Sequence, residues 1–263
     1  VGGTLIALLL GPYAACIAIS VALFIQAIIF GDGGILSFGA NCFNIAFILP
    51  FTGFFIYKIL NKIHLSPFYH KCTIFLSAYI SINLAAFFTA LELGIQPLLF
   101  VDNLGQPLYC PYPLWISIPA MALSHLTIAG IAEGLFTLSL YLFILKTSPN
   151  IIYDSQQIKL NSIFSLLAFL IIISPLGLIA EGTAWGEWAP EEILNDTSSG
   201  VPLGFIPEKL LNGFNYEAFF PDYIMSGTTD ILAYIASAII GVALLIIIFK
   251  ILGSIIYAKK QSL

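Results

Sequence analysis

GDGGILSFGANCFN, residues 31–44, is the stretch that decides the fold of this chain. It lies between two apolar runs, residues 14–30 and 45–59. Besides four glycines it contains four polar side chains, Asp32, Ser37, Asn41 and Asn44. The hydrocarbon core of a membrane offers no water to an irregular backbone, so such a segment at a membrane boundary is buried in protein or lines a wet cavity. We take it as the first candidate for a substrate site.

The composition indicates a membrane protein. Of the 263 residues, 59% are hydrophobic and 9% are charged, and the mean hydropathy is +1.00; soluble domains carry about 25% charged residues. A spanning helix needs about 20 apolar residues. Six runs approach or exceed that length: residues 12–30, 40–60, 72–93, 115–145, 158–180 and 229–249. We predict an all-α polytopic membrane protein, a bundle of about six spanning helices in contact with membrane lipid. The net charge of −5 gives no reason to expect nucleic acid as a partner.

The first apolar run is interrupted by Gly11 and Pro12. Residues 4–10 are too short to cross a membrane. One interpretation is a broken first helix, of the kind that marks transport pathways. The other is a continuous spanning helix with a proline kink.

The lysines set the predicted orientation. All nine basic residues are Lys, and eight of them lie in or beside residues 58–71, residues 146–159 and the C-terminus. By the positive-inside rule these parts are cytoplasmic. The GDGG loop and the acidic segment 181–228 then lie outside, in a multi-pass protein of the plasma membrane.

Ser37, Asn41 and Asn44 are spaced i, i+4 and i+7, which places them on one face of an α-helix. Asparagines in membrane helices commonly hydrogen-bond to neighbouring helices, which is a purely structural alternative. The functional interpretation is that the three side chains frame an outward-facing cavity. Glu92, near the outer end of the third span, is expected to reach water.

His125 and Glu133 lie inside the fourth span, where ionisable side chains are expensive and suggest function. Eight residues apart, they point about 80° away from each other around an α-helix, so each is expected to have its own partner on another helix. Coupling and structural roles both remain open for them. An intramembrane enzyme using both is an alternative that no H-E-x-x-H or G-x-S-x-G motif supports.

Two stretches carry a resemblance to a known family: LLLGPYAACIAISVALFIQAIIFGDGGILSFGANCFNIAF at residues 8–47 and SHLTIAGIAEGL at residues 124–135. They resemble the CbiM/NikM family, the substrate-binding membrane component of cobalt and nickel energy-coupling-factor ABC transporters. PLGLIAEGTAWGEW, residues 175–188, resembles the CbiN/NikN-like extension that is fused to part of this family. We therefore expect a core over residues 1–146 and, over residues 147–263, an extension of two spanning helices with a large outer loop.

The resemblance implies an uptake subunit that captures Co(II) or Ni(II), for example for cobalamin biosynthesis, and that is not itself an enzyme. It implies a CbiQ/NikQ-like coupling subunit and a CbiO/NikO-like ATPase as partners, and no cofactor. The family's metal ligands would precede Val1, so the chain is expected to be truncated at its N-terminus, with no confirmed metal ligand of its own. Asp32, Ser37, Asn41 and Asn44 would then orient the ligands rather than bind the metal. A binder of an organic vitamin is the remaining alternative.

Overall fold

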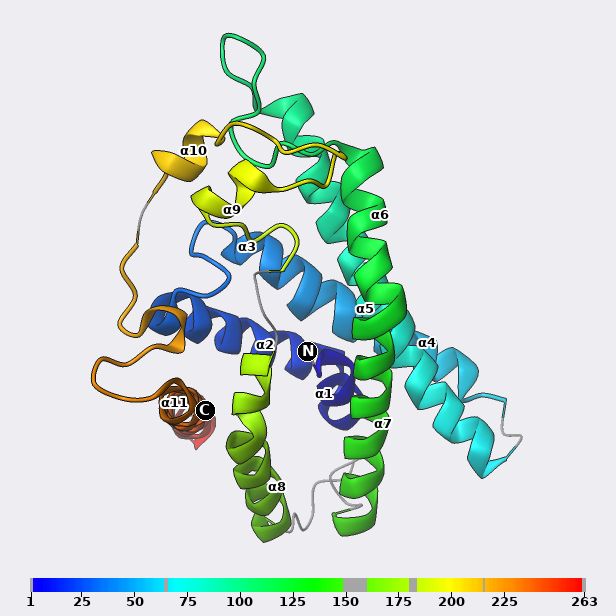
Figure 1. Cartoon of the computed structure of the whole chain (residues 1–263). Coiled ribbons are helices and arrows are strands. Elements are labelled where there is room, and N and C mark those ends of the chain that lie inside the picture. Colours follow the sequence, from blue (N-terminus) through cyan, green and yellow to red (C-terminus); the bar gives the residue numbers. More distant parts are fainter. Residues whose placement is uncertain (1, 64–65, 149–159, 180–183, 215, 262–263) are drawn as a thin grey trace. The chain divides into compact units, whose positions relative to one another are not determined.

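The computed structural model describes all residues except 1, 64–65, 149–159, 180–183, 215 and 262–263 (Figure 1). Its regular elements are helices, and within the described ranges the sole strand-like pairing is an isolated bridge between Val101 and Pro107. The prediction of an all-α polytopic membrane protein is confirmed.

In the described part of the chain, five helical segments are long and apolar enough to span a membrane: Pro12–Phe30, Phe38–Leu60, Pro67–Leu99, Leu114–Thr147 and Asp230–Ile256. The sixth expected run contains a shorter apolar segment, Ile163–Ile179. There α8 (Leu160–Ile173) continues as the tighter 3-10 helix η5 (Ser174–Ile179), in which Pro175 lacks the N–H of a regular turn.

Three of the long segments contain a π-helical stretch, in which each turn holds one extra residue. The first segment joins α2 (Pro12–Ile25) to η1 (Gln26–Phe30). The second contains α3 (Phe38–Asn41), η2 (Cys42–Ile48) and α4 (Leu49–Leu60). The fourth contains α6 (Leu114–Ser124), η3 (His125–Ala129) and α7 (Gly130–Thr147). The remaining elements are α5 (Pro67–Leu99), α9 (Pro190–Asn195), α10 (Glu208–Leu211), the 3-10 turn η6 (Pro221–Tyr223) and α11 (Asp230–Gln261).

The start of the chain is a broken helix. A short helix, α1 (Gly3–Leu10), ends at Gly11, whose φ of 86° lies in the region that favours glycine, and Pro12 then begins α2. Of the two interpretations of this run, the break is therefore the one observed. Five residues of α1 are buried, namely Gly3, Thr4, Leu5, Ala7 and Leu8.

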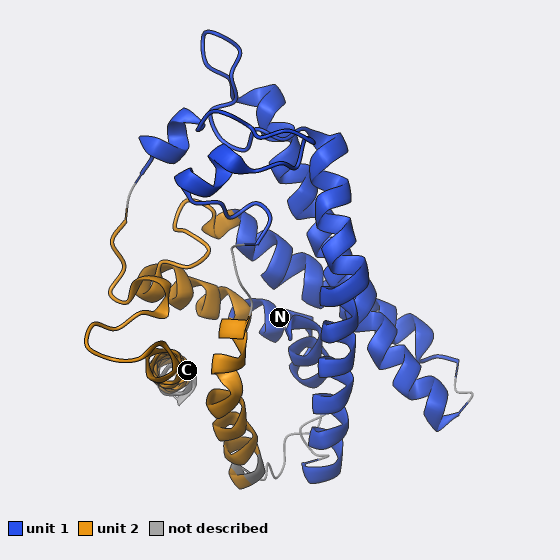
Figure 2. Ribbon diagram, in the orientation of Figure 1, with its two compact units in different colours: residues 1–17, 40–158, 182–215 blue, residues 18–39, 159–181, 216–263 orange. Residues whose placement is uncertain are grey.

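The chain divides into two compact units, coloured separately in Figure 2. Unit 1 comprises residues 1–17, 40–158 and 182–215, and unit 2 comprises residues 18–39, 159–181 and 216–263. Each unit therefore draws on both the core and the extension that the sequence predicts. The boundary at residue 146 stays a prediction.

Unit 1 is built around α5, which contacts α4, α6 and α7, and α1 packs against α4, α5 and α7. Its buried positions are rich in small residues, including Ala7, Ala78 and Ala90, which let membrane helices approach closely. At Gly53 of α4 the approach is close, because a Cβ there would overlap the side chain of Thr4. Leu5 and Leu8 complete an apolar cluster with Ile74 and Tyr141.

Unit 2 is built around α11, which contacts α8, η5 and η6. The ring of Phe30, at the end of η1, is 4% exposed and packs against Phe220 and Tyr223. Tyr223 in turn packs against Tyr234 of α11. An aromatic cluster thus joins the end of the first span to the last one.

Candidate functional site

The most deeply buried carboxylate faces the start of α1. Glu133 of α7 is 1% exposed, and its Oε1 accepts a hydrogen bond of 2.9 Å from the backbone N–H of Gly2. The hydroxyl of Thr137, one turn further along α7, lies 3.4 Å from the same oxygen. The second oxygen, Oε2, has no hydrogen-bond partner among the described residues. A buried acceptor without a partner costs free energy, so this oxygen is the strongest sign of a functional group in unit 1.

A hydroxyl pair holds α1 in place beside this carboxylate. The hydroxyl groups of Thr4 and Ser81 lie 2.7 Å apart and are both buried. Thr4 also fills the space that the missing side chain of Gly53 leaves open. The N-terminal end of α1 is therefore fixed by contacts with α4, α5 and α7.

A second buried polar pair joins η2 to α5. Asn44 is 3% exposed, and its Nδ2 donates a hydrogen bond of 2.7 Å to Oε2 of Glu92. The amide oxygen of Asn44 has no partner among the described residues. Glu92 is half-buried, and this bond to Asn44 is a contact that the sequence does not predict. The interhelical hydrogen bond expected of a membrane asparagine is present at Asn44.

The predicted common face of Ser37, Asn41 and Asn44 is wrong. Ser37 lies in a turn before α3, is exposed, and donates to the carbonyl oxygens of Gly33 and Gly34. Asn41 is the last residue of α3, and Asn44 lies in the π-helical η2. The wider turn of η2 rotates its side chains away from the directions they would have in an α-helix. Ser37 belongs to unit 2 and the two asparagines to unit 1.

Asp32 lies in unit 2, within the GDGG loop. Its Oδ2 accepts a hydrogen bond of 2.5 Å from Nε2 of Gln26 and another from the hydroxyl of Tyr223. Three neighbouring residues, Gly31, Gly33 and Gly34, have φ between 67° and 73°, a conformation that L side chains rarely adopt. The glycines thus form the turn that holds Asp32.

His125 is held by its own helix. Its Nδ1 lies 2.9 Å from the carbonyl oxygen of Met121 and 3.1 Å from the hydroxyl of Ser124. The expectation that His125 has its partner on another helix is therefore wrong, whereas Glu133 accepts from Gly2 outside α7 as well as lying near Thr137 of α7. The two ionisable residues of this span are not brought together. Throughout the described residues, no group of three His, Cys, Asp or Glu side chains is placed to hold a metal ion.

Residues on both sides of α9 contact Tyr112 in unit 1: Trp185 and Trp188 before the helix and Asp196 after it. The Tyr112 hydroxyl, on a side chain 1% exposed, donates to Oδ1 of Asp196, and its ring packs against Trp185 and Trp188 at centroid distances of 6.0 and 5.4 Å. Burial, and then the Asp196 carboxylate, raise the pKa of Tyr112 well above its usual value, so its hydroxyl keeps its proton. No pattern in the sequence indicates this contact.

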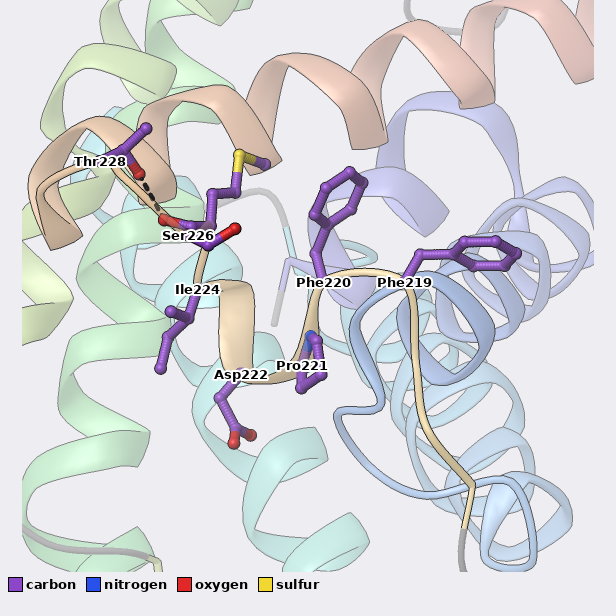
Figure 3. Close-up of a pocket in the computed structure, with 8 residues that line it drawn as sticks. Phe219, Phe220, Pro221, Asp222, Ile224, Ser226 and Thr228 are labelled. Atoms are coloured by element: carbon purple, nitrogen blue, oxygen red, sulfur yellow. Dashed lines mark hydrogen bonds between the residues drawn. The ribbon is translucent and has the colours of Figure 1, made fainter.

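Unit 2 also contains a pocket of about 660 Å³ (Figure 3). The rings of Phe219 and Phe220 lie on one side of it and Ser226 and Thr228 on the other; the remaining lining residues are Pro221, Asp222, Ile224 and Met225. A single carboxylate and a thioether make a poor ligand set for a divalent metal. We do not assign the metal to this pocket.

A polytopic helical bundle with hydrogen-bonded carboxylates inside its spans is typical of membrane transport components. The chain is a member of the CbiM family: residues 1–151 match that family, described as the cobalt uptake substrate-specific transmembrane region. Residues 160–258 match the PDGLE domain.

Similar proteins agree with this assignment. The chain is 42% identical over 251 residues to a probable fused nickel transport protein LarMN of Lactiplantibacillus plantarum, covering 95% of this chain and 75% of that protein. It is 40% identical over 256 residues to the fused nickel transport protein NikMN of Rhodobacter capsulatus, covering 91% and 74%. A crystal structure described as a transition metal transporter matches with a TM-score of 0.54 and 45% identity over 63% of this chain and 68% of that one.

These findings confirm the resemblance seen in the sequence, to both the core and its fused extension. The chain is a membrane component of metal uptake. Nothing in the comparisons supports the organic-vitamin binder or the intramembrane enzyme.

Proposed function

We propose that this chain captures nickel, with cobalt as the competing cargo, for an ATP-driven uptake transporter. The observation that carries the proposal is the fused layout, since both fused relatives described above are named as nickel transport proteins and each covers more than nine-tenths of this chain. The chain contains no G-x-x-x-x-G-K-[ST] motif, so we assign ATP hydrolysis to a separate CbiO/NikO-like subunit and the coupling to a CbiQ/NikQ-like subunit.

We place the metal close to the N-terminal end of α1, with nitrogen ligands from residues that precede Val1 in the full-length protein. Ni(II) and Co(II) suit such ligands. Glu133 supports this arrangement by holding Gly2 and by offering a free, buried carboxylate oxygen. In this proposal Asn44 and Glu92 act as a positioning pair in the same unit, and Asp32 and Ser37 belong to an outer loop.

Uptake of radioactive nickel by cells expressing the full-length protein with its coupling and ATPase subunits tests the proposal. We expect uptake to disappear when the Walker lysine of the ATPase subunit is substituted. We also expect excess unlabelled nickel to suppress this uptake more strongly than excess cobalt does. Uptake indifferent to the ATPase variant would contradict ATP-driven transport. Stronger suppression by cobalt would contradict nickel as the favoured cargo.

A further inference from the structure

Residues 216–223, from the part of the chain that matches the PDGLE domain, bind the end of the first span within unit 2. The hydroxyl of Tyr216 donates to the carbonyl oxygen of Ile28 at 3.1 Å, and the N–H of Phe220 donates to that of Ile29 at 2.9 Å. The last carbonyl groups of a helix have no partner within the helix and need one from outside. The extension supplies two such partners to η1.

The same segment reaches the carboxylate of the GDGG loop. The hydroxyl of Tyr223 donates to Oδ2 of Asp32, the oxygen that also accepts from Gln26. Burial, and then Asp32 itself, raise the pKa of Tyr223 far above the physiological range. The Tyr223 hydroxyl therefore stays protonated and remains a donor.

The backbone at this point is strained. Asp222 and Tyr223 have φ values of 51° and 63°, in the left-handed region that L residues other than glycine seldom occupy. Such a conformation persists where surrounding contacts over-determine it, and it marks functional positions more often than others. Here the Tyr223 ring stacks on Phe30 with centroids 4.9 Å apart and packs on Tyr234 at 5.5 Å.

Gly31 shows how closely the extension approaches the loop. A Cβ built on Gly31 would lie 3.1 Å from the Cβ of Ala218, tighter than an ordinary contact. The glycine is needed both for its φ of 73° and for this approach. The loop and the extension are thus fitted to each other at Gly31 as well as at Asp32.

We propose that Tyr223 is a positioning residue: through its hydrogen bond to Asp32, the extension holds the GDGG loop in the conformation that favours metal capture. Asp32 serves as the acceptor of this contact and does not bind the metal. The effect on metal capture rests on the proposed function, whereas the effect on the loop does not.

Hydrogen exchange of the loop tests the contact without any metal. The sample is the full-length protein in nanodiscs, and the variant is Tyr223→Phe, which keeps the ring stack and removes only the hydroxyl. We expect amide exchange in residues 31–37 to become about tenfold faster, the size expected for the loss of one hydrogen bond to a carboxylate. Tyr234→Phe is the matched control, because it removes a hydroxyl from the same aromatic cluster without touching Asp32. Exchange in Tyr223→Phe that stays within about twofold of the control would overturn the proposal.

A double-mutant comparison assigns the effect to Asp32. Tyr223→Phe introduced into Asp32→Ala should add no further increase in exchange, because the two residues act through one bond. A full additional increase would mean that Tyr223 acts elsewhere, and would overturn the pairing.

Nickel uptake by the complete transporter then tests positioning. We expect Tyr223→Phe to raise the apparent KM for nickel about threefold or more and to leave the maximal rate within about twofold. Faster exchange with an unchanged KM would overturn the positioning role. If the wild-type protein moved no nickel, the proposed function would fail while the exchange result would still decide whether the contact exists.

Discussion

The polar contacts inside the spans differ from those that the extension makes. Within the spans, Glu133 and Glu92 receive hydrogen bonds from Gly2 and Asn44, all within the CbiM-matched part of the chain. Outside the spans, two tyrosine–aspartate pairs join that part to the PDGLE-matched part. They are reciprocal, because Tyr112 of the first part binds Asp196 of the second, and Tyr223 of the second binds Asp32 of the first.

The two kinds of contact differ in the groups that make them. Glu133 is fixed by a backbone group on a short helix wedged among three others, so it moves only if α1 moves. Each tyrosine–aspartate pair instead depends on one hydrogen bond between two side chains outside the spans, with no backbone group of a packed helix as donor. We infer that the core determines binding and that the extension adjusts it.

The largest expected effect is on the packing of α1. In Gly53→Val, the new side chain meets the Cβ, Cγ2 and Oγ1 atoms of Thr4, none of which is the far end of a flexible chain. We expect a loss of about 3 kcal/mol of stability, at the upper end for overpacking, and a falling thermal midpoint in detergent. Gly253→Val is the control, since nothing lies within 4 Å of a Cβ at Gly253. Equal midpoints for the two variants would show that α1 is not fixed as described.

The next effect concerns the carboxyl group of Glu133. Glu133→Gln keeps an oxygen to accept from Gly2 but replaces Oε2, which has no partner among the described residues, with an amide nitrogen. It should weaken nickel binding to the full-length protein about tenfold, the size of one hydrogen bond of about 1.5 kcal/mol. Glu133→Ala should lose more, because Gly2 then also loses its acceptor. Equilibrium binding of radioactive nickel measures both. If the Gln variant bound nickel with wild-type affinity, the carboxyl group of Glu133 would have no role in metal binding.

The sequence predicts those features of this arrangement that depend on residues close together along the chain. The apolar runs predict the helical membrane bundle, and Gly11 with Pro12 makes the break after α1 one of two interpretations of that run. The glycines of the GDGG loop mark a turn, and three of them adopt positive φ. These features depend on local backbone preferences, which a single sequence reveals.

The sequence does not predict contacts between distant residues. Tyr112 and Asp196 are 84 positions apart, and Tyr223 and Asp32 are 191 apart, so no periodicity connects them. The face argument for Ser37, Asn41 and Asn44 fails because Ser37 lies in a turn before α3 and Asn44 lies in the π-helical η2, and composition reveals neither feature. The position of Glu133 inside a span marks it as a candidate from the sequence, but only the structure shows its partner at Gly2.

A smaller effect is expected for the pair in η2 and α5. Asn44→Leu removes the donor to Glu92, and Glu92→Gln removes the charge, each with an expected loss of about 1 kcal/mol, as for hydrogen bonds between membrane helices. Because they share one bond, the double variant should lose less than the sum. Thermal unfolding of the four proteins in detergent measures this coupling. Strict additivity would mean that the two side chains do not interact.

The smallest effect is a response of the Tyr112–Asp196 contact to acid. Burial acts to raise the pKa of Asp196, but hydrogen bonds from Tyr112 and Ser198 outweigh it and leave the pKa below its usual value of 3.8. A carboxyl group whose pKa is lower in the folded state stabilises that state above its unfolded pKa, and this contribution fades as the pH falls through the folded value. The cluster of Tyr112, Trp185 and Trp188 should therefore loosen only below about pH 4, and the tryptophan fluorescence of the folded protein should change there.

Asp196→Asn should abolish this acid transition, since an amide does not titrate, and Tyr112→Phe should move it to higher pH because one of the bonds that lower the Asp196 pKa is lost. Glu191→Gln, on an exposed residue of α9, is the matched control and should leave the transition in place. The tryptophan fluorescence reports this contact directly, so the experiment requires no transport assay at acid pH. A transition that survives in Asp196→Asn would place the titrating group elsewhere and would break the parallel between the two tyrosine–aspartate pairs.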